Sequence, residues 1–175
     1  MVKRCFNYEK MVKRLASQFI YSFNIKFYIT ELYSPGCTIP SESMIPTLNI
    51  NDKLIINKLI KPEDLEYGDI VVFYSPVTKG ERYIKRLIGI GGDTIEIKNG
   101  YLYRNGERIH EPYLVKSIDY EFGPVLVPED NYFFLGDNRN SSYDSHLWPY
   151  PFIEKEKLIG KAVFRYYPFS RVKKF

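Results

Sequence analysis

Two serines and one lysine give this sequence the residue types of a nucleophilic hydrolase. Ser41 and Ser43 lie two positions apart between Pro40 and Pro46, so their hydroxyls point to the same side if the chain there is extended. A serine hydroxyl is a weak nucleophile unless a neighbouring base takes its proton. Lys85, within the mostly apolar run Tyr-Ile-Lys-Arg-Leu-Ile, is one candidate base. The pattern therefore allows one hydroxyl to attack a carbonyl while the other donates a hydrogen bond.

The identity of the base stays open on these residues alone. His110, His146 and several carboxylates are further candidates. A lysine base has to be neutral, which requires its pKa to fall by about three units from about 10.4, within the range that burial produces. Strand alternation puts Lys85 on the face opposite Ile84 and Arg86. The competing interpretation is an exposed lysine on a strand and a Ser-x-Ser turn without any catalytic use.

Composition and charge exclude several other classes of function. The chain has 175 residues, of which 45% are hydrophobic and 26% charged, as expected for one folded domain. Cys5 and Cys37 lack metal-ligand spacing and only two histidines are present, so we expect neither a metal nor another cofactor. The net charge of +4 is carried by residues 1–14, and the neutral remainder predicts no nucleic-acid binding.

Short β-rich runs fill the chain beyond residue 40. Asn99-Gly100 and Asn105-Gly106 are typical of two-residue hairpin turns and predict two consecutive hairpins. The apolar residues 70–73 predict a strand covered on both faces, whereas the alternating residues 94–98 predict one wet face. We expect a mainly β fold, compact and antiparallel, without a long helix after residue 40. The predicted strands cover residues 53–58, 69–74, 94–98, 101–104, 132–135 and 162–167.

The segment 15–33 follows the basic N-terminus and is largely apolar. Leu15, Phe19 and Phe23 repeat at helical spacing, while Lys26 and Glu31 interrupt the segment. A helix that marginally spans a membrane, one that lies on its surface and one that packs on the domain all stay open. A cleaved signal peptide is disfavoured, because no small-residue cleavage site precedes the turn predicted at 34–36. We expect an anchor helix in 1–33, with a cytoplasmic N-terminus, and one catalytic domain in 34–175.

Several ordered stretches resemble the sequence boxes of the type I signal peptidases, which are membrane-anchored Ser-Lys endopeptidases. Residues 39–48 match the I-P-S-x-S-M-x-P-T-L box of that family, and residues 67–73 match its G-D-x-V-V-F strand. Residues 83–93 match the lysine box, and residues 136–145 resemble the G-D-N-R box. The resemblance runs from about residue 27 to residue 172 in the family's order and is typical of its compact members, whose fold is β-rich and barrel-like.

The resemblance assigns a role to each polar residue of these boxes. Ser43 resembles the nucleophile and Lys85 the general base that takes its proton. Ser41 occupies the position whose hydroxyl forms the oxyanion hole together with the backbone N–H of Ser43. Ser142 resembles the serine that hydrogen-bonds the lysine amine and orients it.

The resemblance also implies what surrounds the site. Asp144 and Arg139 resemble a supporting salt-bridge or hydrogen-bond pair. The implied partners are preprotein signal peptides and membrane lipid, with the catalytic domain on the extracytoplasmic face of the cytoplasmic (inner) membrane. Asn140 and His146 resemble the residues found at these positions in the thylakoidal processing peptidases, so the resemblance also allows a location in a thylakoid-type membrane. Small pockets that accept Ala-x-Ala before the scissile bond are expected to be walled by Met44, Leu48, Tyr83 and Ile84.

Two alternatives compete with this function. A self-cleaving repressor-type Ser-Lys protease shares the chemistry but needs a DNA-binding helix-turn-helix. Only about 40 residues precede Ser43, and the domain that follows the basic N-terminus is charge-neutral, so the chain has neither the room nor the basicity for one. The other alternative is an inactive, membrane-tethered β binding module in which Ser43 and Lys85 are remnants. The intact set of Ser43, Lys85 and Ser142 argues against such decay.

Overall fold

A computed structural model describes residues 33–175 as two antiparallel β-sheets. The N-terminal helix predicted up to residue 33 falls outside the described residues except for its last position, Tyr33, which begins the first strand. Within residues 33–175 the helical segments are all short 3-10 turns, as expected from the lack of a long helical pattern. They are η1 (Pro62–Asp64), η2 (Arg139–Ser141), η3 (Lys155–Lys157) and η4 (Phe169–Arg171).

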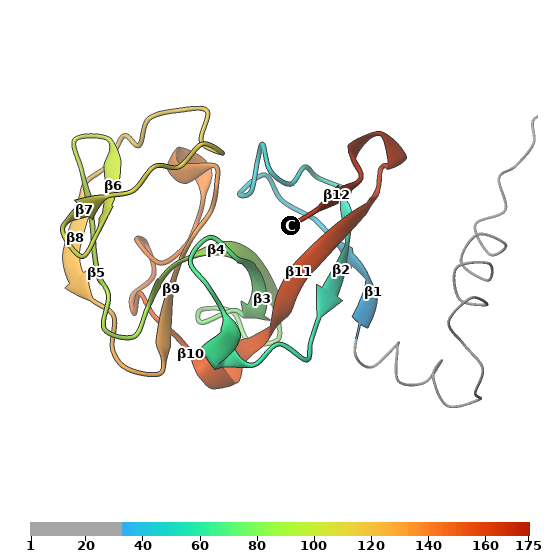
Figure 1. Cartoon of the computed structure of the whole chain (residues 1–175), viewed down its shortest axis with the longest axis horizontal. Helices are drawn as coiled ribbons and strands as arrows, with labels where there is room; N and C mark the ends of the chain where they lie inside the picture. The colour runs from blue at the N-terminus through green and yellow to red at the C-terminus, as the bar shows by residue number, and fades with distance from the viewer. Residues whose placement is uncertain (1–32) are drawn as a thin grey trace, which may run out of the picture.

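The larger sheet brings the catalytic candidates together. Its long central strand β11 pairs with β2 on one side and with β3 on the other, and the sheet fills the middle and right of Figure 1. The short strand β12 (Lys173–Lys174) also pairs with β11. The order across the sheet is β1 (Tyr33–Thr38), β2 (Lys53–Asn57), β11 (Leu158–Tyr167), β3 (Ile70–Tyr74), β4 (Arg82–Ile90), β9 (Asn131–Leu135) and β10 (Ile153–Glu154).

The smaller sheet lies on the left of Figure 1. Its order is β7 (Glu107–Arg108), β6 (Tyr101–Arg104), β5 (Thr94–Lys98) and β8 (Phe122–Leu126). Both predicted hairpins are present, because Asn99-Gly100 joins β5 to β6 and Asn105-Gly106 joins β6 to β7. All four turn residues have positive φ, between 51° and 81°, as a two-residue hairpin turn requires.

The sequence patterns did not predict the edge strands β1 and β8, because each of them contains adjacent proline and glycine residues. The turn predicted at 34–36 is wrong, since these residues lie within β1, where the register shifts between Pro35 and Cys37. β8 contains Gly123-Pro124 and forms the edge of the smaller sheet. Edge strands tolerate proline and register irregularities because one side of their backbone needs no partner.

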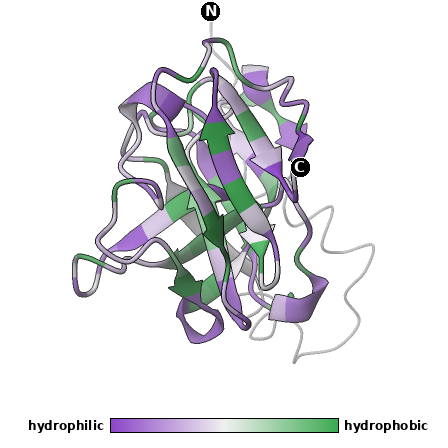
Figure 2. Cartoon of the chain, turned by 90° about the vertical axis from the view of Figure 1, so that its left-hand side faces the viewer, coloured by the Kyte–Doolittle hydropathy of each residue, from purple (hydrophilic) through white to green (hydrophobic). Residues whose placement is uncertain are grey.

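The core is built from three clusters of buried apolar side chains. One of them contains Ile39, Met44 and Leu48 and lies between β2, β3 and β4. Residues 70–73 of β3 are all buried, and β5 alternates between buried and half-buried positions, as predicted for each strand. Figure 2 shows such alternating hydrophobic and hydrophilic positions along strands that face the viewer. Ile84 of β4 packs in the same cluster as Ile39, Met44 and Leu48, and this packing fixes the position of the segment after β1 relative to β4.

Candidate active site

Ser43, in the segment between β1 and β2, meets Lys85 of β4. The Lys85 amine lies 2.5 Å from the Ser43 hydroxyl oxygen, within hydrogen-bonding distance. Only 8% of Ser43 and 5% of Lys85 is exposed, so the contact is shielded from water. A nucleophile and a base in direct contact are what covalent catalysis by serine requires.

Ser43 is held by a compact turn and not by extended chain. Residues 41–47 form successive turns, with the Leu48 N–H donating to the Met44 carbonyl at 2.8 Å. The Ser43 carbonyl accepts the N–H of Asn138 at 3.0 Å, which joins this turn to the segment after β9. The chain at the two serines is therefore not extended, so the condition under which both hydroxyls would point to the same side is not met. The turn nevertheless leaves the Ser41 hydroxyl oxygen 3.4 Å from that of Ser43.

Lys85 is positioned by the pleat of β4. Its backbone pairs with Val71 of the buried strand β3. The side chain lies on the same face as that of Tyr83, whose ring centre is 5.9 Å from the amine. Arg86 points to the opposite face, as strand alternation predicts. The rigid ladder between β3 and β4 thus fixes the height of the amine relative to Ser43.

Burial favours the neutral form of Lys85. Desolvation lowers the pKa of its amine from 10.5 to about 8, although the negative charges of Asp144 and Asp137 act in the raising direction. At this pKa roughly a tenth of the amine is neutral at pH 7 and half of it near pH 8, and the neutral form is the one that accepts a proton. The arrangement therefore supplies a serine with a base able to activate it.

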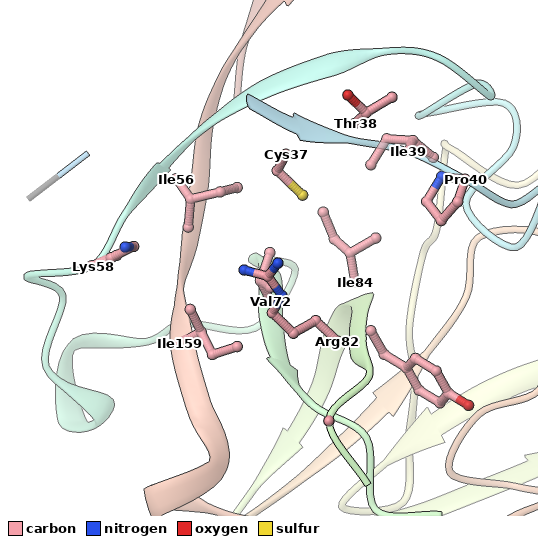
Figure 3. Close-up of a pocket in the computed structure, with 12 residues that line it drawn as sticks. Cys37, Thr38, Ile39, Pro40, Ile56, Lys58, Val72, Arg82, Ile84 and Ile159 are labelled. Carbon is pink, nitrogen blue, oxygen red and sulfur yellow. The ribbon is translucent and has the colours of Figure 1, made fainter. Parts of the chain in front are cut away.

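A cavity of about 570 Å³ opens above the Ser43–Lys85 contact, and a second of about 490 Å³ adjoins it, shown in Figure 3. Tyr83 and Ile84 line both cavities, as expected for pocket walls. Met44 and Leu48 line neither of them, and both are 0% exposed in the core beneath. Their assignment as pocket walls is thus corrected, because their side chains pack inward below the serine turn.

The strand edge beside the first cavity is open. Residues 82–85 of β4 pair with β3 on one side, while pairing with β9 on the other side begins only at Arg86. Within residues 33–175 no strand covers the second side of that segment. An extended peptide can add there as a further strand, which would carry its backbone past Ser43.

Comparison with known proteins is consistent with this geometry. Residues 11–167 match the sequence profile of a family described as signal peptidase, peptidase S26. The chain belongs to the signal peptidase S26 family. It is 43% identical over 166 residues to the probable signal peptidase I-2 of Synechocystis sp., covering 91% of this chain and 73% of that protein.

Two further relatives of this S26 peptidase illustrate the range of the family. The probable thylakoidal processing peptidase 2 of Arabidopsis thaliana is 42% identical over 147 residues, which cover 77% of this chain and 38% of that protein. The crystal structure of a signal peptidase I from Enterococcus faecalis aligns with a TM-score of 0.50 at 33% identity, covering 55% of this chain and 95% of that chain. The mainly β, antiparallel fold expected from the sequence is thereby confirmed.

Ser142 of this S26 peptidase is buried beside the Ser43–Lys85 pair, but the expected hydrogen bond to the lysine amine is not formed. Ser142 is only 4% exposed, and its buried hydroxyl has no partner within the described residues. Gly136 lies against both the Ser142 hydroxyl and the Ser43 carbonyl, so closely that a Cβ at residue 136 would clash with each. The glycine therefore lets Ser142 approach the turn that carries the nucleophile.

Asp144 and Arg139 do not pair with each other, which corrects the pairing implied by the sequence. One Asp144 oxygen lies 2.6 Å from the His146 ring nitrogen Nδ1, and the other accepts the Gly136 N–H at 2.8 Å. Arg139 instead donates two hydrogen bonds to the Glu111 carboxylate, at 2.7 and 2.5 Å. Both oxygens of Asp144 are thus occupied by partners other than Arg139.

The sequence did not single out three ion-pair residues near the site: Arg86, Asp137 and Glu111. Arg86 donates to both oxygens of Asp137, at 2.7 and 2.6 Å, and to the Gly68 carbonyl at 2.6 Å. Arg86 lies in the same sequence box as Lys85, and Asp137 lies in the same box as Arg139. This closeness in sequence to candidate site residues could have identified both. Glu111 had no such signal, since it comes from the loop after β7.

Residues 33–175 of this S26 peptidase contain no helix with the length and apolar character that a membrane crossing requires.

Proposed function

We propose that this chain is a serine endopeptidase that removes N-terminal signal peptides from exported preproteins. The observation that carries this proposal is the buried 2.5 Å contact between the Lys85 amine and the Ser43 hydroxyl. The relatives named signal peptidase I support the substrate class. A lysine buried against a serine beside an open strand edge is suited to cleaving an extended peptide.

The reaction follows from the position of the amine. Neutral Lys85 accepts the proton of the Ser43 hydroxyl as the oxygen bonds to the scissile carbonyl carbon. The resulting ammonium gives this proton to the leaving amine, and the carbon–nitrogen bond breaks to leave an acyl ester on Ser43. The same amine then takes a proton from water as the water oxygen attacks the ester carbon, and it returns this proton to the Ser43 oxygen as the ester bond breaks and the signal peptide is freed.

The developing oxyanion requires hydrogen-bond donors close to Ser43. We assign this role to the Ser41 hydroxyl, 3.4 Å from the Ser43 hydroxyl oxygen, and to the backbone N–H of Ser43. Ser142 is proposed to orient the lysine amine, because its hydroxyl is buried without a partner at the same site. Asp144 acts on Lys85 through its charge, and Arg139 stabilises the adjoining loop through Glu111.

The substrate is proposed to bind as an added strand along residues 82–85, with small residues before the scissile bond. Tyr83 and Ile84 line the space available to those side chains. Met44 and Leu48 support this space from the core beneath.

The cellular setting is proposed from the N-terminal sequence. Residues 1–33 would associate with the cytoplasmic membrane or a thylakoid-type membrane, with the basic N-terminus in the cytoplasm. Residues 34–175 would then form the catalytic domain on the extracytoplasmic face, next to membrane lipid. The resemblance to a thylakoidal processing peptidase supports the second membrane type.

The test is cleavage of a preprotein with an Ala-x-Ala site by membranes that contain the full chain. The wild type should cut after the second alanine, as read by fragment masses, and both Ser43→Ala and Lys85→Ala should abolish cutting. Lys157→Ala is the matched control, since its exposed side chain pairs only with Glu154 at the surface. Absence of cleavage by folded wild type would favour the inactive binding module instead.

A further inference from the structure

The two carboxylates that act on Lys85 have counter-charges of different kinds. Burial lowers the pKa of the Lys85 amine, whereas the negative charges of Asp144 and Asp137 act to raise it. Asp137 pairs with Arg86 at 2.6 Å, and a guanidinium stays charged at every pH at which proteins fold. Asp144 pairs instead with the ring nitrogen Nδ1 of His146, at 2.6 Å. Imidazoles ordinarily gain a proton between about pH 5 and pH 8, so of the two counter-charges the one beside Asp144 is the one that varies.

The Asp144–His146 pair is enclosed by protein. The Asp144 side chain is 0% exposed and the His146 side chain 9%. The Tyr120 ring stacks on the imidazole, with the two ring centres 3.9 Å apart and the two planes 6° apart. This stack holds the plane of the imidazole, so that Nδ1 stays directed at the carboxylate. Because charges interact more strongly where water is excluded, a proton on this ring changes the field around Asp144 more than a proton on a surface histidine would.

Asp144 connects the imidazole to the catalytic turn. Its second oxygen, Oδ2, accepts the Gly136 N–H at 2.8 Å. Gly136 in turn lies against the Ser142 hydroxyl and the Ser43 carbonyl, with no room for a Cβ. The carboxylate is therefore shared between the imidazole and the backbone beside the nucleophile.

Other charged and titratable groups reach this pair from three segments. Tyr120, before β8, stays neutral across this pH range because burial raises the pKa of its hydroxyl. Arg139 of η2 is paired with Glu111 of the loop after β7, so these two charges largely cancel. Asp119 is exposed, and solvent screens its charge. Among these groups the imidazole is therefore the charge that changes with pH.

We propose that His146 is a positioning residue that acts on Lys85 through Asp144: the protonated imidazole offsets the carboxylate, so that the Lys85 amine gives up its proton more readily below neutral pH. This inference rests on the proposed function and adds a residue that adjusts its base. The sign follows from the charges. A carboxylate beside a neutral ring favours the ammonium form of Lys85, whereas the same carboxylate beside an imidazolium favours it less. The enzyme thereby keeps more neutral amine on the acid side than a lysine in fixed surroundings would.

The first measurement is kcat/KM against pH for one peptide with an Ala-x-Ala site, with the full chain in detergent. In His146→Asn, kcat/KM should fall about tenfold per pH unit below its midpoint, because asparagine keeps a side-chain N–H near the place of Nδ1 but gains no charge. The wild type should fall less steeply. If the proton on the ring lowers the pKa of Lys85 by about half a unit, the wild type exceeds this variant roughly threefold at about pH 6 and equals it at about pH 9.

A fixed positive charge and a matched control complete the comparison. His146→Arg stays charged throughout, so the pH at which its kcat/KM is half-maximal should lie below that of the wild type. His110→Asn is the control, because His110 is the other histidine of the chain and is exposed on the segment after β7. Its profile should match that of the wild type. The shape and midpoint of each profile are compared, so general losses of activity cancel.

NMR titration tests the same coupling without any cleavage. The imidazole signals of His146, assigned by their absence in His146→Asn, should show a change of charge between about pH 5 and pH 8. The Lys85 amine, followed through ¹³C at Cε and assigned by its absence in Lys85→Arg, should titrate at lower pH in His146→Arg than in His146→Asn.

Two results would overturn the inference. One is an imidazole that keeps a single charge state across that range, and the other is an identical Lys85 titration in His146→Arg and His146→Asn. Failure of the proposed function is a different result, in which folded enzyme cleaves no peptide. If the two titrations still behave as expected in that case, the peptidase assignment fails while the coupling between the ring and the amine is supported.

Discussion

Lys85 and Arg86 are neighbours in β4, yet their side chains end on opposite faces of the strand, at the hydroxyl of Ser43 and at the carboxylate of Asp137. The first contact spans 2.5 Å and the second 2.7 Å. Asn138, the residue after Asp137, donates its N–H to the Ser43 carbonyl. β4 therefore positions the base, Lys85, on one face. On its other face Arg86 holds the loop at Asp137, and the next residue of that loop, Asn138, holds the backbone of Ser43.

The pH dependence of cleavage follows from the lowered pKa of Lys85. Only the neutral amine accepts the Ser43 proton, so kcat/KM should rise with pH and reach half its plateau near the pKa of about 8. The measurement is kcat/KM for one peptide from about pH 6 to about pH 10. A profile that is flat across this range would argue against lysine as the base.

Replacing Asp144 by asparagine should move that profile to lower pH. The Asp144 carboxylate raises the pKa of Lys85 through its charge, and an amide of the same shape removes the charge while it can still accept the Gly136 N–H. The expected result is a lower midpoint in the same kcat/KM titration. A midpoint displaced to higher pH would contradict the electrostatic role of Asp144.

Ser41→Ala tests the oxyanion donor. Removing one such donor costs about 10²–10³ in kcat, because its hydrogen bond strengthens as charge develops on the substrate oxygen. KM should change little, and folding should be unaffected since Ser41 is exposed. Single-peptide kinetics on the purified full chain measures both constants, and an unchanged kcat would remove Ser41 from this role.

Glu111→Gln should destabilise the fold, because it leaves the buried Arg139 guanidinium without its carboxylate. Removing one partner of a buried ion pair lowers the free energy of unfolding by about 3–5 kcal/mol, whereas replacing both partners by apolar residues lowers it far less. Urea unfolding can be followed by Trp148, which is buried and the one tryptophan of the chain. The double variant Glu111→Leu/Arg139→Met is the comparison. An equal loss of unfolding free energy in the single and the double variant would contradict this explanation.

The sequence predicted those elements whose conformation depends on neighbouring residues alone, such as hairpin turns and alternating strands. β5 and β6 begin and end where the sequence placed them, because the Asn-Gly turns and the period of two fix both the boundaries and the faces. Lys85 and Ser43 were expected to meet because the chain resembles a known family, since nothing in the spacing alone brings them together.

The remainder depended on tertiary packing. Glu111 reaches Arg139 only because the smaller sheet folds against the segment after β9, a contact without any sequence pattern. Met44 and Leu48 were assigned to pocket walls because the family resemblance implied it, and the sequence alone does not distinguish an apolar side chain that faces a cavity from one that faces the core. The turn geometry of residues 41–47 decides between these two directions.

The uncovered edge of β4 carries a hazard beyond substrate binding. On the side away from β3, residues 82–85 have no strand beside them within the described chain, and such an edge can recruit extended segments of unrelated chains or of another copy. Charges at an edge oppose this self-association, and Glu81 and Arg82 are both exposed where the edge begins. These two charges therefore protect the open edge against aggregation, so neutralising both would lower the colloidal stability of the protein.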